Sequence, residues 1–335
     1  MHYRYDRKIA RIRAGEYRKG DFMIADAKDG DMANPLVLAG PVWDAKGKLL
    51  RHRTRAEFLD VVTEVVQQDL LDIMLVSASN LEQLTKAGAF KGTKVKPAFR
   101  GNDTTDVWGV RPSGYGKLGP SRPFRSPSLK RISKADLSDL ALYSVTFNND
   151  LEADLRSLEA FRDFREDAIQ NGITYFLEVF NPNVDTGLPA DEIGSYVNDC
   201  LLRCLSGLLE EERPEFLKYP YNGPAALEEL VSFDPSLVVG VLGGGAGTNR
   251  DTFELLYQAE KYGARVALFG RKINQAESQL DLIAMMRKVV DGEMMPLEAV
   301  KAYHSALKEK GLAPVRSLED DSLVTEAVLK EAVSA

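Results

Sequence analysis

The stretch EFLKYPYNGP, residues 215 to 224, places a lysine inside a short apolar segment. Lys218 lies between Leu217 and Tyr219, and an Asn-Gly turn follows closely. Lysine is rarely buried without a partner, because taking an ammonium group out of water is costly. Two interpretations follow. Either the side chain extends so that its charge reaches water, or it is held as a neutral amine that can attack a carbonyl carbon.

A glycine-rich run, VLGGGAGTNRDTFE, ends another apolar segment and leads into an expected helix. Gly243, Gly244 and Gly245 would let a phosphate group approach the backbone N–H groups there. The run matches neither a P-loop nor a dinucleotide fingerprint, and a plain tight turn is the alternative. Gly270-Arg271 ends the next apolar segment and adds a guanidinium group that can hold a phosphate. We predict a phosphate site here, with pairing of Arg271 to a neighbouring carboxylate as the alternative.

A third polar cluster, FRGNDTTDVWG, follows an apolar segment that ends at Arg100. Its side chains, Asp103 among them, offer a cation, an amide, hydroxyls and carboxylates. Recognition of a polyol or a phosphate is one interpretation, and capping of the loop by Asp103 or Asp106 is another. A divalent metal is a third, but no other ligand set supports one, and we expect neither a metal nor a cofactor.

The elements that must position these residues follow a regular pattern. Eight short apolar runs alternate with helical stretches, which is typical of strands buried on both faces of a parallel sheet. The pattern predicts a (β/α)8 TIM barrel, with a doubly wound open sheet as the alternative. The predicted strands are Leu36–Gly40, Leu71–Ser77, Val95–Arg100, Ala141–Phe147, Ile173–Phe180, Glu215–Tyr219, Leu237–Leu242 and Arg265–Phe269.

In such a barrel the carboxyl ends of the strands form the face that carries the active site. Lys218 lies near the end of the sixth predicted strand, and the two glycine turns follow the seventh and the eighth. This position favours the neutral amine, which would form a Schiff base whose iminium acts as an electron sink for making or breaking a carbon–carbon bond. The alternative is an electrostatic lysine that holds a substrate oxyanion or a core carboxylate.

Three segments in this order, FLKYPYNGP, VVGVLGGGAGT and GARVALFGRKINQ, resemble the class I aldolases of the group that includes archaeal-type fructose-bisphosphate aldolase and aminodideoxyheptulosonate synthase. The resemblance covers roughly the last third of the barrel. It implies that Lys218 is the Schiff-base lysine and that Gly243, Gly244, Gly270 and Arg271 bind phosphate.

The sequence also departs from that family. Members usually carry an Asp-His pair after the first strand, for which Asp44 in LAGPVWDAKG is an inexact substitute. Their proton-shuttling tyrosine lies on the fifth strand, where FLEVFNPN has Phe180. Because phenylalanine moves no proton, we expect Glu178 to take this role, with Tyr219 and Tyr221 as the other candidates.

Composition limits the partners and the compartment. The chain of 335 residues has a formal net charge of -7, which argues against binding nucleic acid or an anionic membrane. No apolar run approaches the roughly 18 residues of a membrane span. Cys200 and Cys204, one helical turn apart, are expected to be core thiols, and the lack of a disulfide framework favours the cytoplasm.

We expect residues 1–335 to form a single barrel domain with three additions. These are an N-terminal arm over residues 1–30, a loop insertion over 101–134 and a helical extension over 293–335. The insertion would leave the active face as a lid or a partner contact, since so long a loop is uncommon without a function. The extension is expected to serve packing or contacts within a homo-oligomer.

The leading functional hypothesis is a class I aldolase-like lyase that acts on a small phosphorylated sugar or ketose through a lysine Schiff base. An isomerase or epimerase on the same barrel is the rival, with Lys218 electrostatic and Glu178 as the base. A third hypothesis is a barrel that binds a sugar phosphate without catalysis. Trapping with borohydride separates the first hypothesis from the other two.

Overall fold

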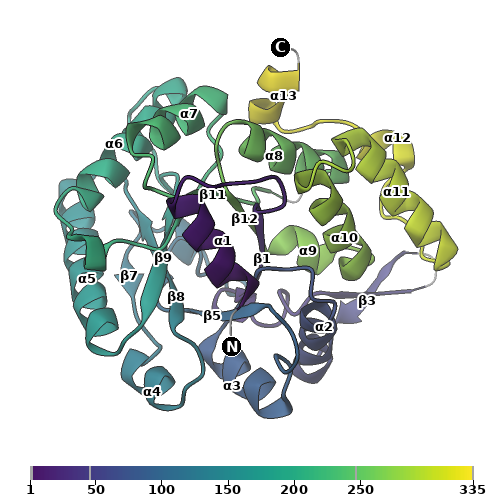
Figure 1. The fold of residues 1–335 in the computed structure, drawn as a ribbon, viewed down its shortest axis with the longest axis horizontal. Helices are drawn as coiled ribbons and strands as arrows, with labels where there is room; N and C mark the ends of the chain where they lie inside the picture. The colour runs from purple at the N-terminus through teal and green to yellow at the C-terminus, as the bar shows by residue number, and fades with distance from the viewer. Residues whose placement is uncertain (1–2, 45–46, 246, 334–335) are drawn as a thin grey trace.

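The structure is a computed structural model that describes residues 3–44, 47–245 and 247–333. Its parallel strands close into an eight-stranded barrel in the order β1-β12-β11-β10-β9-β8-β5-β4, which confirms the predicted TIM barrel over an open sheet (Figure 1). The barrel strands are β1 (Met23–Lys28), β4 (Ile73–Val76), β5 (Lys96–Arg100), β8 (Leu140–Thr146), β9 (Thr174–Phe180), β10 (Leu217–Tyr219), β11 (Val239–Leu242) and β12 (Val266–Phe269).

Helices surround the barrel between successive strands (Figure 1). A capping box begins the helix Arg55–Gln67, because the Thr54 hydroxyl accepts from the Glu57 N–H while the Glu57 carboxylate accepts from the Thr54 N–H. The surrounding helices are α2 (Arg55–Gln67), α3 (Ala78–Ala87), α4 (Leu129–Lys134), α5 (Leu151–Gln170), α6 (Ile193–Leu205), α7 (Pro224–Phe233), α8 (Asn249–Lys261), α9 (Arg271–Gln275) and α10 (Gln279–Val290). Short 3-10 turns lie at η1 (Gly30–Met32), η3 (Ala190–Glu192) and η4 (Glu210–Glu212).

The first barrel strand differs from the prediction. It is β1, whereas Leu36–Gly40 lies in a turn before the hairpin of β2 (Pro41–Trp43) and β3 (Leu49–His52). Two charges interrupt β1, and both are fully buried: Lys28 Nζ lies 3.1 Å from Asp26 Oδ2 and donates to Gln279 Oε1 of α10 at 2.8 Å. Burial raises the pKa of Asp26 to about 6. Because both charged residues lie on β1, this strand is not a continuous apolar run and the sequence pattern did not identify it.

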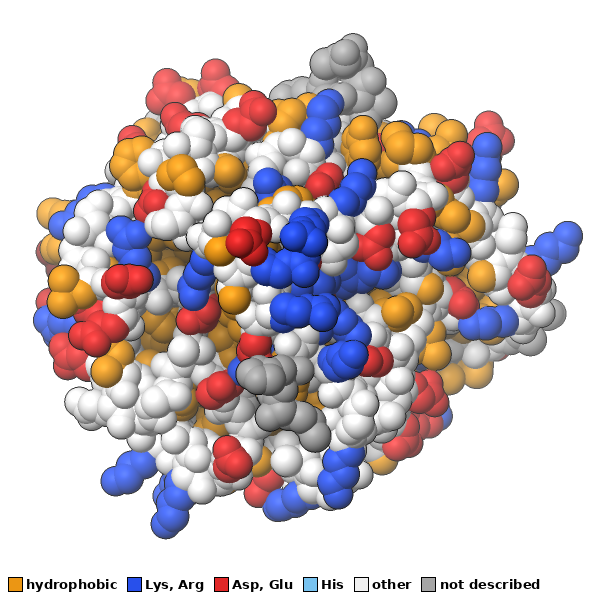
Figure 2. All heavy atoms as spheres, in the orientation of Figure 1, with side chains coloured by type: hydrophobic (Ala, Val, Ile, Leu, Met, Phe, Trp, Pro, Cys, Tyr) orange, Lys and Arg blue, Asp and Glu red, His pale blue; other side chains and the backbone are white. Residues whose placement is uncertain are grey.

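The N-terminal arm closes the barrel at the amino ends of the strands. Its helix α1 (Arg4–Arg13) inserts Tyr5 and Ile9 among the side chains of the barrel interior. Lys8 donates to the Phe22 carbonyl at 3.1 Å and pairs with Asp72 at 2.9 Å. Figure 1 shows α1 across the centre of this face, and Figure 2 shows Lys and Arg side chains gathered around it.

The insertion after β5 folds back on itself at the other end of the barrel. It contains β6 (Asp103–Thr104), η2 (Tyr115–Lys117) and β7 (Pro123–Phe124). Helix α4 also lies within residues 101–134, the range predicted for the insertion. Trp108 stacks on Tyr115 with ring centroids 4.5 Å apart. Asn183, which follows β9, donates to the carbonyls of Gly116 and Gly119 at 3.0 Å each. The insertion is therefore tied to the loop after β9.

The C-terminal extension packs against α8 and α10 (Figure 1). It contains α11 (Pro296–Glu309), α12 (Leu318–Asp321) and α13 (Ala327–Val333). Thr248, the N-cap of α8, donates its hydroxyl to the Leu323 carbonyl at 2.7 Å. Within the described residues, no helix has the length and apolarity needed to cross a membrane.

Candidate active site

Four polar side chains meet inside the mouth of the barrel, at the carboxyl ends of β5, β8, β9 and β10. They are Arg100, Ser144, Glu178 and Lys218, and the strand register places Ser144 and Lys218 on either side of Glu178. Lys218 is 7% exposed and Glu178 is 2% exposed. The ammonium group of Lys218 forms an ion pair with Glu178 Oε1. Lys218 is thus buried with a partner and does not extend to water.

The second oxygen of Glu178 is also engaged. Ser144 Oγ donates to Glu178 Oε2 at 2.5 Å and accepts from Arg100 Nη2 at 3.0 Å. Arg100 Nη2 itself lies 3.7 Å from Glu178 Oε2. One carboxylate therefore lies between the lysine and a hydroxyl that a guanidinium group holds in place. This arrangement gives a proton on Lys218 a direct acceptor.

Asp29 is a site residue that the sequence analysis missed. It follows β1 and accepts from Arg100 Nη1 at 2.7 Å. Burial opposes the charge of Arg100, but Asp29 and Glu178 outweigh this effect and raise its pKa. The sequence does contain a signal for it, since Asp29-Gly30 is a polar turn directly after β1. The signal was missed because the charged residues of β1 hid that segment from a search for apolar strands.

Asp44 was predicted to follow the first barrel strand, and that placement is wrong because β1 ends at Lys28. Asp44 instead lies after β2 in the hairpin, where its Oδ1 accepts from the Lys48 N–H at 2.8 Å. It is not among the described residues that line the mouth of the barrel.

Asp103 lies beside Arg100, with Oδ1 3.8 Å from Arg100 Nε. Its other oxygen accepts from Ser126 Oγ at 3.1 Å. The position of Asp103 is thus compatible both with stabilisation of the loop and with recognition of a polyol or a phosphate. Burial raises the pKa of Asp103. Over the described ranges, no cluster of three or more His, Cys, Asp or Glu side chains has the arrangement of a metal site.

These side chains line a cavity of about 720 Å³, a size that suits a small-molecule site. Phe180 lines it at the position where the family resemblance places a tyrosine. Neither Tyr219 nor Tyr221 lines it among the described residues. Tyr221 donates to Gln258 of α8 at 2.8 Å, and burial raises the pKa of Tyr219 to about 12. Of the predicted proton carriers, only Glu178 is in the cavity.

The two predicted glycine turns also meet at this cavity, which Gly243, Gly244, Gly270 and Arg271 all line. Arg271 Nη2 donates to the Gly244 carbonyl at 3.2 Å. A side chain at Gly243 would overlap Phe269, since a methyl group built there lies 2.4 Å from its ring. The structure thus brings together the two turns that the sequence placed after neighbouring strands.

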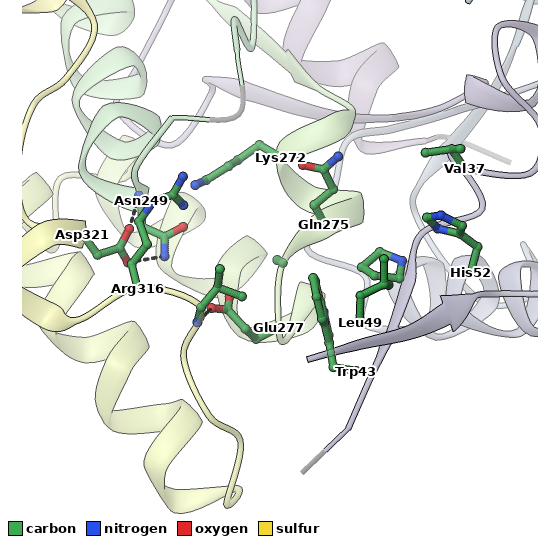
Figure 3. Close-up of a pocket in the computed structure, with 13 residues that line it drawn as sticks. Val37, Trp43, Leu49, His52, Asn249, Lys272, Gln275, Glu277, Arg316 and Asp321 are labelled. Carbon is green, nitrogen blue, oxygen red and sulfur yellow. Dashed lines mark hydrogen bonds between the residues drawn. The ribbon is translucent and has the colours of Figure 1, made fainter. Parts of the chain in front are cut away.

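Lys272 adds a second cation beside the glycine turns. Its ammonium group donates to the Gly247 carbonyl at 2.7 Å. Burial lowers the pKa of Lys272 to about 8, and the nearby charge of Arg316 acts in the same direction. Lys272 also lines a second cavity of about 350 Å³, between the β2–β3 hairpin, α9 and the C-terminal extension (Figure 3). The two cavities adjoin along Lys272 and Val37.

The fold is that of a (β/α)8 barrel, and solved structures of this class resemble it at low sequence identity. A crystal structure of an archaeal fructose 1,6-bisphosphate aldolase matches with a TM-score of 0.61 and 13% identity, over 86% of this chain and 99% of that one. The structure of an archaeal fructose-1,6-bisphosphate aldolase with its catalytic lysine bound to a carbinolamine intermediate matches with a TM-score of 0.60 and 14% identity, over 86% and 100%. The fructose-bisphosphate aldolase of Slackia heliotrinireducens matches with a TM-score of 0.64 and 10% identity, over 90% of each chain.

No protein-family model matches the sequence, and comparison with curated proteins found no match. The structural neighbours therefore establish the fold of this chain and not its chemistry.

Proposed function

We propose that this protein is a class I aldolase-like lyase that forms a Schiff base between Lys218 and a small phosphorylated carbonyl compound. The observation that carries the proposal is the buried pair of Lys218 and Glu178, which lies in a cavity shared with the two glycine turns. The carboxylate in contact with the ammonium group is a proton acceptor within reach, and loss of that proton gives the free amine that attacks a carbonyl carbon.

The first half of the reaction makes the iminium. The ammonium group of Lys218 gives a proton to Glu178, and the free amine attacks the substrate carbonyl carbon to give a carbinolamine. Glu178 then returns the proton to the departing hydroxyl, which leaves as water while the carbon–nitrogen double bond forms. Ser144 and Arg100 hold the Glu178 carboxylate during both transfers.

The second half breaks the carbon–carbon bond. A carboxylate, for which Glu178 is best placed, takes the proton of the substrate hydroxyl two carbons from the iminium carbon. The resulting carbonyl leaves as an aldehyde, and the bonding electron pair passes to the iminium nitrogen to give an enamine. The enamine takes a proton back at carbon, and water then releases the second product from Lys218. No external oxidant or reductant enters this sequence.

The phosphate group of the substrate would lie at the two glycine turns. Arg271 and Lys272 supply positive charge there, and the Gly244 and Gly245 backbone supplies N–H donors. Arg100 and Asp103 also line the cavity, where they would contact the hydroxyl groups of the substrate.

A second function has two observations in its favour. Phe180 removes the expected proton-shuttling tyrosine, and Lys218 is charge-paired, so an isomerase or epimerase could use Glu178 as its base with Lys218 as an electrostatic group. The two candidates differ in their products. The test is to incubate the protein with a panel of ketose and aldose phosphates and to separate cleavage from isomerisation by chromatography. Lys218→Met should abolish cleavage, and isomerisation in place of cleavage would overturn the aldolase proposal.

A further inference from the structure

The predicted phosphate site already faces a carboxylate of this chain. Glu326 lies just before α13, and its carboxylate oxygens rest against Gly244 and Gly245. A methyl group built on Gly244 would lie 3.3 Å from Glu326 Oε2, and one on Gly245 would lie 3.3 Å from Oε1. The Gly245 N–H is close enough to this carboxylate to favour its charged form. A carboxylate thus lies against two of the glycines at which a substrate phosphate was expected.

The backbone around Glu326 is firmly attached to the start of α8. Asp251, in the first turn of α8, accepts from the Thr325 N–H at 2.7 Å and from the Glu326 N–H at 3.2 Å. Farther back in the extension, Asp321 accepts from the Asn249 backbone and side chain at 2.7 and 2.6 Å, and Figure 3 shows this contact at the edge of the second cavity. These bonds hold the segment in place without using the Glu326 side chain.

The charges around Glu326 are those that would hold a phosphate. Arg271 and Lys272 both stabilise its charged form, as does the Gly245 N–H. Burial and the neighbouring Asp251 act more strongly in the other direction, and the pKa of Glu326 is raised. The carboxylate is therefore bound at this position but held weakly, because burial and the charge of Asp251 oppose its negative charge.

We propose that Glu326 is an internal anion at the phosphate site and that the substrate phosphate displaces its carboxylate on binding. This inference rests on the proposed function, because it takes the glycine turns as the phosphate site. Only the side-chain torsions of Glu326 have to change, since Asp251 holds the backbone independently. A dianionic phosphate, with more acceptor oxygens and more charge than a carboxylate, has the advantage in this exchange. Glu326 therefore sets how strongly the site selects a phosphate over weaker anions.

The experiment measures binding of inorganic phosphate by titration calorimetry to the wild type and to Glu326→Gln. Glutamine keeps the size of the side chain and an oxygen for the Gly245 N–H but removes the competing charge. We expect Glu326→Gln to bind phosphate about tenfold more tightly, the fold-change that corresponds to the loss of one charge-assisted hydrogen bond. Glu319→Gln is the matched control, since Glu319 is exposed on α12 of the same segment and should leave binding unchanged.

Equal phosphate affinity of the wild type and Glu326→Gln would overturn the inference, and so would a failure of both to bind phosphate. A second measurement tests the proposed lyase chemistry separately from the displacement of Glu326. Trapping of dihydroxyacetone on Lys218 with borohydride needs no phosphate site and should be the same in both proteins. If trapping fails while the affinity difference is found, the lyase proposal is wrong and the displacement of Glu326 stands.

Discussion

The most informative single substitution is Glu178→Gln, because it separates formation of the Schiff base from proton transfer. Glutamine keeps the shape of the side chain and can still accept from Ser144 Oγ, but it cannot take a proton from Lys218. We expect turnover to fall by about 10²–10⁴-fold, the usual contribution of a general acid–base group. Borohydride trapping at Lys218 should persist, since a lysine without its buried counter-ion more readily becomes the neutral amine.

The same substitution has a cost in stability that can be worked out from the structure. Lys218 and Glu178 side chains are 9% and 2% exposed, so the pair is almost wholly out of water. Removing one partner of a buried pair typically costs about 3–5 kcal/mol. Loss of the proton from Lys218 would relieve part of this cost, so the lower end of the range applies. Urea denaturation followed by circular dichroism measures it.

The matched control is Glu254→Gln. Glu254 is a buried glutamate on α8 that pairs with Arg250 at 3.0 Å and is not among the described residues that line the barrel mouth. Its substitution should lower stability while turnover and trapping remain as in the wild type. If Glu178→Gln retains full turnover, or if both variants lose turnover equally, Glu178 does not carry the proton and the reasoning about the pair fails.

Three further predictions concern the phosphate site and the insertion. Arg271→Ala should weaken sulfate binding by about tenfold, the low end for a charged hydrogen bond because Arg271 is exposed, and unchanged affinity by calorimetry would count against the site. Sulfate affinity should fall as the pH rises through about 8, where Lys272 loses its proton, and Lys272→Gln should remove this dependence; a flat profile in the wild type would contradict it. Asn183→Ala removes the bonds to Gly116 and Gly119, so limited proteolysis should cut the insertion faster, and an unchanged rate would show that the loop is held by other contacts.

The barrel was predictable because most of its strands are continuous apolar runs. The strands that end at Arg100, Phe180 and Tyr219 are found where the sequence indicates them. The first strand was not predictable in this way. Asp26 and Lys28 stand on it as a buried pair, and a pattern that counts apolar residues reads such a segment as a loop. The same error placed Asp44 at the site in place of Asp29.

The site was predicted in part for a similar reason. Lys218 and Glu178 pair with each other near the carboxyl ends of neighbouring strands, so their proximity follows once the fold is known. The pairing of Arg100 with Asp29 depends on the unrecognised strand and could not be foreseen. The contact of Glu326 with Gly245 joins segments that are far apart in the sequence, and no local pattern specifies it. Local periodicity thus predicts the helices and strands, whereas contacts between polar residues far apart in the sequence can be identified only once the fold is known.

The central claim is that Lys218 forms a covalent iminium with a carbonyl substrate. Its most direct test is borohydride reduction in the presence of dihydroxyacetone phosphate, followed by mass spectrometry of the peptide that contains Lys218. The account predicts a stable adduct on Lys218 in the wild type and none on the corresponding peptide of Lys218→Met. An enzyme that turns over sugar phosphates while no adduct forms on Lys218 would contradict it.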